Sequence, residues 1–303
     1  MTEQAIQLEG VHKDYGKVHA LRGLDLGVQK GEVFGFLGPN GAGKTTTIRC
    51  MLDLIRPNQG MIRVLGMDPQ SSPQAVKAKV GYLPGDLQLE GDFTPRDFFR
   101  FIRKLRKDLR PWKDLLALAD RVDLALDIKI KTLSQGNKQK VGLIQSLVSD
   151  VPLLMLDEPT LGLDPLMKQE VLNIISEESE RGTTIFFSSH ILSEVQKIAD
   201  RVGIIRKGQL VEIAQTDDLI NRALTRATIQ FKEGVAQSSF AGLENVNILR
   251  VNEDRHAFTV EIKGEMDGFI KKIAEYPVSD LEIHRPSLEE VFINYYKEEE
   301  EEV

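Results

Sequence analysis

Hydrophobic and polar positions alternate along the first 37 residues, in the pattern of strands that bury one face. A turn signal at residues 14–17 separates two such runs. The alternating apolar positions are Ile6, Leu8, Val11, Leu21, Leu24, Leu26 and Val28. The N-terminal part of the chain therefore predicts half-buried strands.

Continuous apolar runs at residues 151–156 and 184–187 are typical of strands buried on both faces of a parallel sheet. Residues 80–83 and 202–205 are further predicted strands. The stretch from about residue 86 to 150 follows a helical pattern instead, with Thr94 and Pro95 as a typical helix start. The expected apolar face of that helix comprises Phe98, Phe99, Phe101, Ile102 and Leu105, and a second helix is predicted at residues 112–119. The fold class is therefore α/β, with an antiparallel β subdomain and a helical subdomain.

Shorter, more alternating segments begin beyond about residue 220. Strands are predicted at residues 228–231, 246–251, 258–262 and 281–284, and helices at residues 266–276 and from Ser287, which has capping-box spacing to Glu290. We interpret residues 221–303 as a small α+β domain that ends in an acidic tail at residues 298–302. The isolated histidines His256 and His284 are interpreted as ordinary surface or partly buried residues.

Composition limits the classes of protein to consider. The chain has 303 residues, 41% hydrophobic and 28% charged, which suffices for a large domain and a smaller one. No run approaches the roughly 18 apolar residues of a membrane span, and the N-terminus lacks a signal-peptide layout, so we expect a cytoplasmic protein. The single cysteine, Cys50, excludes an intramolecular disulfide and a cysteine-built zinc site. The net charge of −7 argues against a nucleic-acid partner.

Residues 38–45 read Gly-Pro-Asn-Gly-Ala-Gly-Lys-Thr, a complete G-x-x-x-x-G-K-[ST] motif between an apolar run and a predicted helix. Its glycines let successive backbone N–H groups face a nucleotide's phosphates, and the following helix adds the positive end of its dipole. Lys44 then reaches the outer phosphates, and the Thr45 hydroxyl binds Mg²⁺. The predicted nucleotide-binding residues of this loop are Gly38, Pro39, Asn40, Gly41, Ala42, Gly43, Lys44, Thr45 and Thr46.

Two acids, Asp157 and Glu158, follow the apolar run at residues 151–156. Side chains alternate across a strand, so one acid faces the Mg²⁺ held by Thr45 while the next meets the water that attacks the γ-phosphate. We therefore expect Asp157 to bind the metal and Glu158 to act as the general base.

The segment Leu133-Ser134-Gln135-Gly136-Asn137 stands before a predicted helix whose apolar positions include Val141, Leu143, Ile144 and Leu147. Ser134 and Gly136 direct a hydroxyl and free backbone N–H groups at an anion. Taken alone, this segment is better explained as a plain helix N-cap, and the surrounding motifs decide between the two interpretations.

Together these motifs resemble the ATP-binding subunit of an ATP-binding cassette (ABC) transporter, in order over residues 1 to about 220. The resemblance implies a P-loop NTPase fold with ATP and Mg²⁺ as ligands. It also implies catalysis by Lys44, Glu158 and His190, of which His190 would sense the γ-phosphate. The signature motif would be Leu133, Ser134, Gln135, Gly136 and Asn137, completing the site of a second copy in a head-to-tail dimer. Asp164 would contact the partner's phosphate loop, and adenine would stack on Tyr15.

One position departs from the family pattern. After the predicted strand at residues 80–83, Gly85 and Asp86 stand where the family has a glutamine. Glycine offers no side chain to the metal or the attacking water, and Asp86 or a water molecule is a candidate substitute. The segment at residues 285–292 resembles the C-terminal extension of cassette subunits in drug, antibiotic or ion exporters, which favours export over uptake.

The resemblance implies an ATPase that drives export of a small molecule, drug, antibiotic or ion through a separate membrane permease. The chain would then be peripheral on the inner face of the cell membrane. Two alternatives stay open: a soluble cassette ATPase without a permease, acting in translation or DNA repair, and a regulatory subunit that binds ATP with weak turnover. A GTPase-like switch is disfavoured, because the only Asn-Lys pair, at residues 137–138, lies in the signature helix.

Overall fold

The computed structural model describes residues 3–89, 92–216, 218, 225–240, 242–243, 245–252 and 256–284. The chain divides into two compact units, Met1–Ala214 and Gln215–Val303. The sequence places the boundary near residue 220, and the structure divides the chain a few residues earlier. Among the described residues, no helix is both long enough and apolar enough to cross a membrane.

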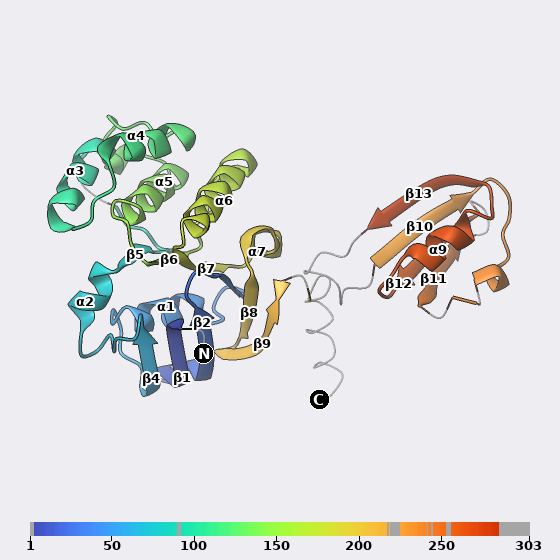
Figure 1. Cartoon of the computed structure of the whole chain (residues 1–303), viewed down its shortest axis with the longest axis horizontal. Helices are drawn as coiled ribbons and strands as arrows, with labels where there is room; N and C mark the ends of the chain where they lie inside the picture. The colour runs from blue at the N-terminus through green and yellow to red at the C-terminus, as the bar shows by residue number, and fades with distance from the viewer. Residues whose placement is uncertain are drawn as a thin grey trace. The chain divides into compact units, whose positions relative to one another are not determined.

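A six-stranded sheet forms the centre of the first unit (Figure 1). In spatial order its strands are β5 (Val80–Leu83), β6 (Leu153–Asp157), β7 (Thr184–Ser189), β3 (Val33–Leu37), β8 (Arg201–Arg206) and β9 (Gln209–Gln215). The first five pair in parallel, and every residue of β3, β6 and β7 is buried, as their apolar runs predict. Parallel strands end at one edge of a sheet, so the segments that follow β3, β6 and β7 meet there.

A three-stranded antiparallel sheet joins the large sheet through a shared core. Its strands are β1 (Gln4–Tyr15), β2 (Val18–Gln29) and β4 (Gln59–Val64), in the order β2-β1-β4. The core combines the alternating apolar residues of these strands with α1 (Lys44–Met51) and the aromatic rings of Phe34, Phe36 and Phe186. Burial of these side chains fixes α1, and with it the loop before α1, between the two sheets.

The remaining helices of this unit are α2 (Pro73–Ala78), α3 (Pro95–Leu105), α4 (Trp112–Arg121), the 3₁₀ turn η1 (Ile130–Thr132), α5 (Gln135–Ser146), α6 (Pro165–Glu180) and α7 (Leu192–Ile198). Figure 1 shows α3, α4 and α5 gathered beside the β5 end of the sheet. Thr94 caps α3 as predicted, since its side chain accepts a hydrogen bond from the N–H of Asp97 at 3.2 Å. The predicted helical subdomain is therefore present as three helices.

The predicted apolar face of α3 is only partly in the core, since Phe98 and Ile102 are half-buried and two of its five residues are exposed. Phe99 is buried, but Phe101 and Leu105 are 46% and 68% exposed. The ring of Phe101 lies instead against that of Phe93, which is also exposed, with 6.1 Å between the ring centroids. The apolar stripe is wider than the part of α3 that reaches the neighbouring helices, so the rest of it remains at the surface.

Two arginines join the helical subdomain to α6. Arg110, only 4% exposed, donates two hydrogen bonds to the Glu178 carboxylate at 2.6 and 2.7 Å. Arg121 donates two to Glu177, both at 2.7 Å. These hydrogen bonds raise the pKa of each arginine and lower the pKa of Glu177. The pairs fix α4 against the helix that follows the acid pair of β6.

The second unit is a four-stranded antiparallel sheet with the strand order β11-β12-β10-β13. Its elements are β10 (Thr225–Phe231), the 3₁₀ turn η2 (Gln237–Phe240), β11 (Val246–Asn252), β12 (Ala257–Ile262), α9 (Asp267–Ile273) and β13 (Val278–His284). With η2 and α9 as its two crossovers, this order is that of a ferredoxin-like βαββαβ unit. The predicted helix from Ser287, the 285–292 segment and the acidic tail lie outside the described residues.

Candidate functional site

The glycine-rich loop follows β3 and leads into α1, which begins at Lys44. Gly41 and Gly43 have φ angles of 80° and 113°, in the region that favours glycine. A Cβ at Gly38 would lie 2.3 Å from the carbonyl oxygen of Ile205, and one at Gly43 would lie 2.7 Å from that of Ala20. The loop therefore needs glycine both for its turns and for its close approach to neighbouring backbone.

Lys44 is 6% exposed and points back into its own loop. Its Nζ donates to the carbonyl oxygens of Gly38 at 2.6 Å and Pro39 at 3.2 Å, and lies 3.1 Å from Oε1 of Glu158. Thr45, the next residue, is half-buried in the first turn of α1. Three oxygen atoms thus hold the lysine charge inside the glycine-rich loop.

Asp157, the last residue of β6, is fully buried. Its Oδ1 accepts a hydrogen bond from the Ser188 hydroxyl, whereas its Oδ2 has no hydrogen-bond partner in the part of the chain that the structure describes. A Cβ at Gly85 would lie 3.0 Å from that free oxygen. The carboxylate therefore keeps one oxygen available beside a residue that has no side chain.

Glu158 has the left-handed φ of 51° and is held at each of its polar groups. Its N–H contacts the carbonyl oxygen and the hydroxyl oxygen of Ser188 at 3.2 and 3.1 Å. Its carbonyl oxygen accepts from Nε2 of Gln139 at 2.9 Å. Its carboxylate contacts Lys44 through Oε1 and Nδ1 of His190 through Oε2, at 2.7 Å. Lys44, Asp157, Glu158 and His190 therefore form one cluster.

Tyr82, on β5, is affected by the same cluster. Burial and the negative charge of Asp157 raise the pKa of its phenol to about 12, and the hydrogen-bonded Arg49 of α1 partly opposes this shift.

Asp86, the candidate substitute for the missing glutamine, is exposed, and its Oδ2 lies 3.4 Å from Nε2 of Gln88.

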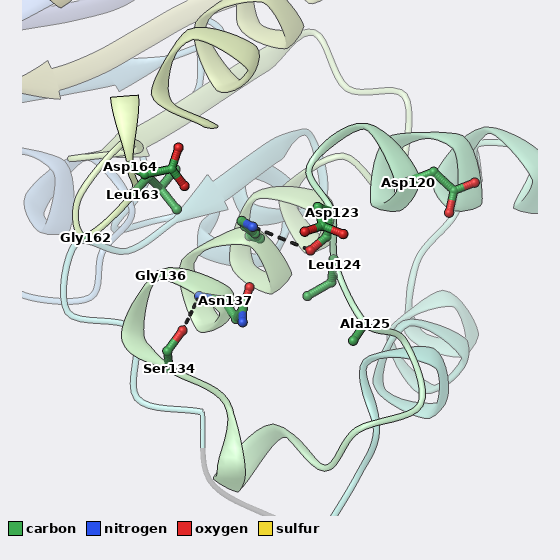
Figure 2. Close-up of a pocket in the computed structure, with 11 residues that line it drawn as sticks. Asp120, Asp123, Leu124, Ala125, Ser134, Gly136, Asn137, Gly162, Leu163 and Asp164 are labelled. Atoms are coloured by element: carbon green, nitrogen blue, oxygen red, sulfur yellow. Dashed lines mark hydrogen bonds between the residues drawn. The ribbon is translucent and has the colours of Figure 1, made fainter. Parts of the chain in front are cut away.

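Ser134 caps α5, because its side chain accepts a hydrogen bond from the N–H of Asn137 at 3.3 Å. A Cβ at Gly136 would lie 2.5 Å from the carbonyl oxygen of Gly162, so the two loops pack backbone to backbone. Figure 2 shows both loops lining a pocket of about 580 Å³. Asp164 also lines this pocket, and its Oδ1 caps α6 by accepting from the N–H groups of residues 166 and 167 at 3.0 and 3.1 Å.

Tyr15 lies at the end of β1, with 47% of its surface exposed and Nζ of Lys13 5.2 Å from its ring centroid. Among the hydrogen bonds between described residues, neither Tyr15 nor Ser134 reaches the Lys44 cluster. The structure thus brings Lys44, Asp157, Glu158 and His190 together in one chain. Three residues of the signature motif, Ser134, Gly136 and Asn137, line a pocket that includes none of these four.

Gln139 belongs to none of the motifs found in the sequence, and those motifs assign Ser188 no contact of its own. Gln139 is 1% exposed on α5, next to apolar residues of the same buried face. A polar residue at a buried helical position is the signal that identifies it.

A glycine-rich loop between a parallel strand and a helix, with Lys44 facing an acid pair at the end of β6, defines a P-loop nucleoside triphosphatase. The family model for ABC transporters matches residues 21–161. The chain is 32% identical to the daunorubicin resistance ATP-binding protein DrrA3 of Streptomyces coeruleorubidus, over 97% of this chain and 96% of that protein.

Another relative is the Nod factor export ATP-binding protein I of Bradyrhizobium diazoefficiens, 32% identical over 77% of this chain and 78% of that protein. A solved structure of an ATP-binding subunit of an ABC transporter matches with a TM-score of 0.64 and 26% identity, over 71% of this chain and 91% of that one. The chain belongs to the ABC transporter family and is one of its ATP-hydrolysing, ATP-binding subunits. The predicted family, the ATPase activity and the P-loop fold are confirmed.

Proposed function

We propose that two copies of this chain bind ATP and Mg²⁺ between the phosphate loop of one copy and the signature segment of the other. The observation that carries the proposal is the cluster of Lys44, Asp157, Glu158 and His190, which gathers a phosphate-binding cation, a metal ligand and a base. Ser134 and Gly136 belong to a different pocket of the same chain. In a head-to-tail dimer each copy supplies the other with this segment.

Within the site, Lys44 exchanges Glu158 and its loop carbonyls for the outer phosphates of ATP. The residues fit Mg²⁺, because Asp157 has a buried oxygen without a partner and the Thr45 hydroxyl stands at the start of α1. When bound, the metal withdraws charge from the phosphates. Glu158 then accepts the proton of the attacking water, a role that typically contributes about 10²- to 10⁴-fold in rate.

His190 would keep Glu158 in place through the 2.7 Å contact and sense the γ-phosphate. The exposed ring of Tyr15 is available to stack on adenine, and Asp164 would contact the phosphate loop of the partner. Closure of the dimer is the mechanical step, since only the γ-phosphate of ATP is contacted by both copies.

We infer that the work is export of a small molecule, drug, antibiotic or ion through a separate permease. Support comes from the names of the relatives, one a daunorubicin resistance protein and one a Nod factor export protein. The exposed pair Phe93 and Phe101 on the helical subdomain offers the permease an apolar contact. The chain would then lie on the cytoplasmic face of the cell membrane, without a nucleic-acid partner.

Gly85 favours one second candidate, an ATP-binding regulatory subunit with weak turnover. The glycine leaves Asp157 without the neighbouring side chain that is typical of the family. A turnover assay on the purified protein separates this candidate from a motor, because a regulatory subunit binds ATP with little phosphate release.

Glu158→Gln tests the main proposal. The variant is expected to bind ATP, to lose about 10²- to 10⁴-fold in hydrolysis rate, and to remain dimeric in ATP as measured by light scattering. Glu32→Gln is the matched control, since Glu32 pairs with Arg201 at 3.1 Å, away from the phosphate loop. Hydrolysis near the wild-type rate would remove Glu158 as the base, and a monomer in saturating ATP would contradict the dimer.

A further inference from the structure

Glu158 adopts a backbone conformation that residues other than glycine seldom take. Its φ of 51° places the residue in the left-handed region, where the Cβ crowds its own backbone. Such a conformation persists only where the surroundings enforce it. The groups that hold the main chain of Glu158 therefore decide where its carboxylate points.

Three described residues hold the polar groups of that main chain. Leu161, in the turn that follows, donates its N–H to the carbonyl oxygen at 3.1 Å, and the other two residues come from neighbouring elements. Ser188, on β7, accepts from the N–H through its carbonyl and its hydroxyl, at 3.2 and 3.1 Å. Gln139, on α5, donates from Nε2 to the carbonyl oxygen at 2.9 Å. One constraint thus comes from the sheet and another from the helix that begins at the signature segment.

The orientation of the Gln139 amide follows from its partner. A carbonyl oxygen only accepts hydrogen bonds, so the amide nitrogen has to face it. The amide oxygen is then buried without a hydrogen-bond partner among the described residues, in a side chain that is 1% exposed. Burial of an unpaired oxygen is unfavourable, and an apolar residue of the same length would avoid it. Gln139 therefore donates its hydrogen bond to Glu158 although its own amide oxygen stays unpaired.

Helix α5 carries both the signature segment at its start and Gln139, which contacts Glu158. Ser134 caps α5, and Gln139 follows on its second turn. Building on the proposed function, we propose that Gln139 is a positioning residue that fixes the main chain of Glu158 to the signature helix. When Ser134 engages the nucleotide held by the partner copy, α5 and the general base of its own site move together. Each ATP site thereby acts on the base of the other.

Gln139→Met in the full chain tests the assignment, because methionine keeps the length and flexibility of the side chain but donates no hydrogen bond. We expect kcat for ATP hydrolysis to fall about tenfold while KM and the ATP dissociation constant stay within about twofold of wild type. Gln139→Glu, which sets a carboxylate against the carbonyl, is expected to lose more. Gln145→Met is the matched control on α5, since Gln145 is partly exposed, and it should leave kcat unchanged.

Two results would overturn the assignment. An unchanged kcat in Gln139→Met means that the hydrogen bond does not position the base. A parallel loss of kcat, ATP affinity and melting temperature means that Gln139 only supports the fold. Failure of the proposed function has a different signature, because hydrolysis by Glu158→Gln at the wild-type rate removes the base itself and the role of Gln139 with it.

Discussion

Glu158→Gln is expected to bind ADP about five- to tenfold more tightly than the wild-type protein. In the structure Nζ of Lys44 lies 3.1 Å from Oε1 of Glu158 and donates to the carbonyl oxygens of Gly38 and Pro39. A phosphate that binds Lys44 has to displace this carboxylate. Glutamine keeps the shape of the side chain but removes its charge, so the lysine is released more easily.

The magnitude follows from the loss of one charge from an ion pair, because glutamine removes the charge of the carboxylate and leaves that of Lys44 in place. Exposed ion pairs contribute up to about 1 kcal/mol, and this pair is more buried, so the exchange weakens the resting contact by about 1 kcal/mol or somewhat more. A difference of about 1.0–1.4 kcal/mol is about five- to tenfold in affinity. The side chains of Lys44 and Glu158 are 6% and 13% exposed, so salt screens the pair only weakly. Relief of repulsion between Glu158 and the phosphates adds in the same direction.

Isothermal titration calorimetry with ADP measures this effect without the closed dimer, because ADP lacks the γ-phosphate that both copies contact in the proposed mechanism. Glu32→Gln changes the net charge equally but lies next to Arg201, at the other end of β3, and should bind ADP as the wild type does. An ADP affinity of Glu158→Gln that is equal to or weaker than the wild-type value would refute the reasoning.

Two further outcomes follow from the structure. Gly85→Gln restores the residue typical of the family, but its Cβ would lie 3.0 Å from Oδ2 of the buried Asp157. Because crowding of this kind typically costs about 1–3 kcal/mol, the Mg²⁺ concentration that half-saturates ATP hydrolysis should rise about tenfold, with a smaller rise for Gly85→Ala. A higher kcat in Gly85→Gln at low Mg²⁺ would contradict this. Glu177→Gln should lower the melting temperature by about 1–3 °C at pH 7, since the pair with Arg121 is partly exposed. Hydrogen bonds from Arg121 lower the pKa of Glu177 below its usual 4.5, so its contribution is present above that pH and is lost as the pH falls through the lower, folded value. The difference in melting temperature should therefore narrow below about pH 4.5, and a constant difference across the pH series would exclude this cause.

Local signals in the sequence were sufficient for most elements that position the site. The buried runs at residues 151–156 and 184–187 became β6 and β7, and Thr94 caps α3. No strand was predicted at β4, because its residues show only a short alternation. That alternation begins at Gly60, a glycine with a φ of 93°. The strand is fixed by pairing with β1, some fifty residues earlier, and such pairing leaves no local pattern.

The outer part of α3 could not be predicted for a related reason. Its sequence specifies an apolar stripe, but the extent of its burial depends on which helices lie beside it. Phe99 reaches the core while Phe101 and Leu105 do not, although all three belong to the same stripe. Sequence periodicity therefore predicted the helix and its capping, and only the structure separated its core residue from its surface residues.

One part of the candidate site could be predicted from local sequence and another part could not. The glycine-rich loop and the acid pair are short motifs whose chemistry is contained in adjacent residues, so the sequence predicted the cluster of Lys44, Asp157 and Glu158. The contact between Gln139 and Glu158 joins residues separated by 19 positions, on a helix and after a strand. No local pattern specifies that contact, which depends on the packing of α5 against the sheet.

In the proposed mechanism, the contacts of Glu158 link nucleotide binding to catalysis. Lys44 and His190 hold its carboxylate. Ser188, Gln139 and the N–H of Leu161 hold its main chain. Phosphate binding removes the contact with Lys44 and leaves the main-chain contacts of Glu158, because phosphate competes for that lysine and not for the residues that hold the main chain. The carboxylate then has one free oxygen for water while its backbone stays in place. A nucleotide that left Lys44 paired with Glu158 would leave the base occupied, so the same exchange that admits the phosphate prepares the residue that hydrolyses it.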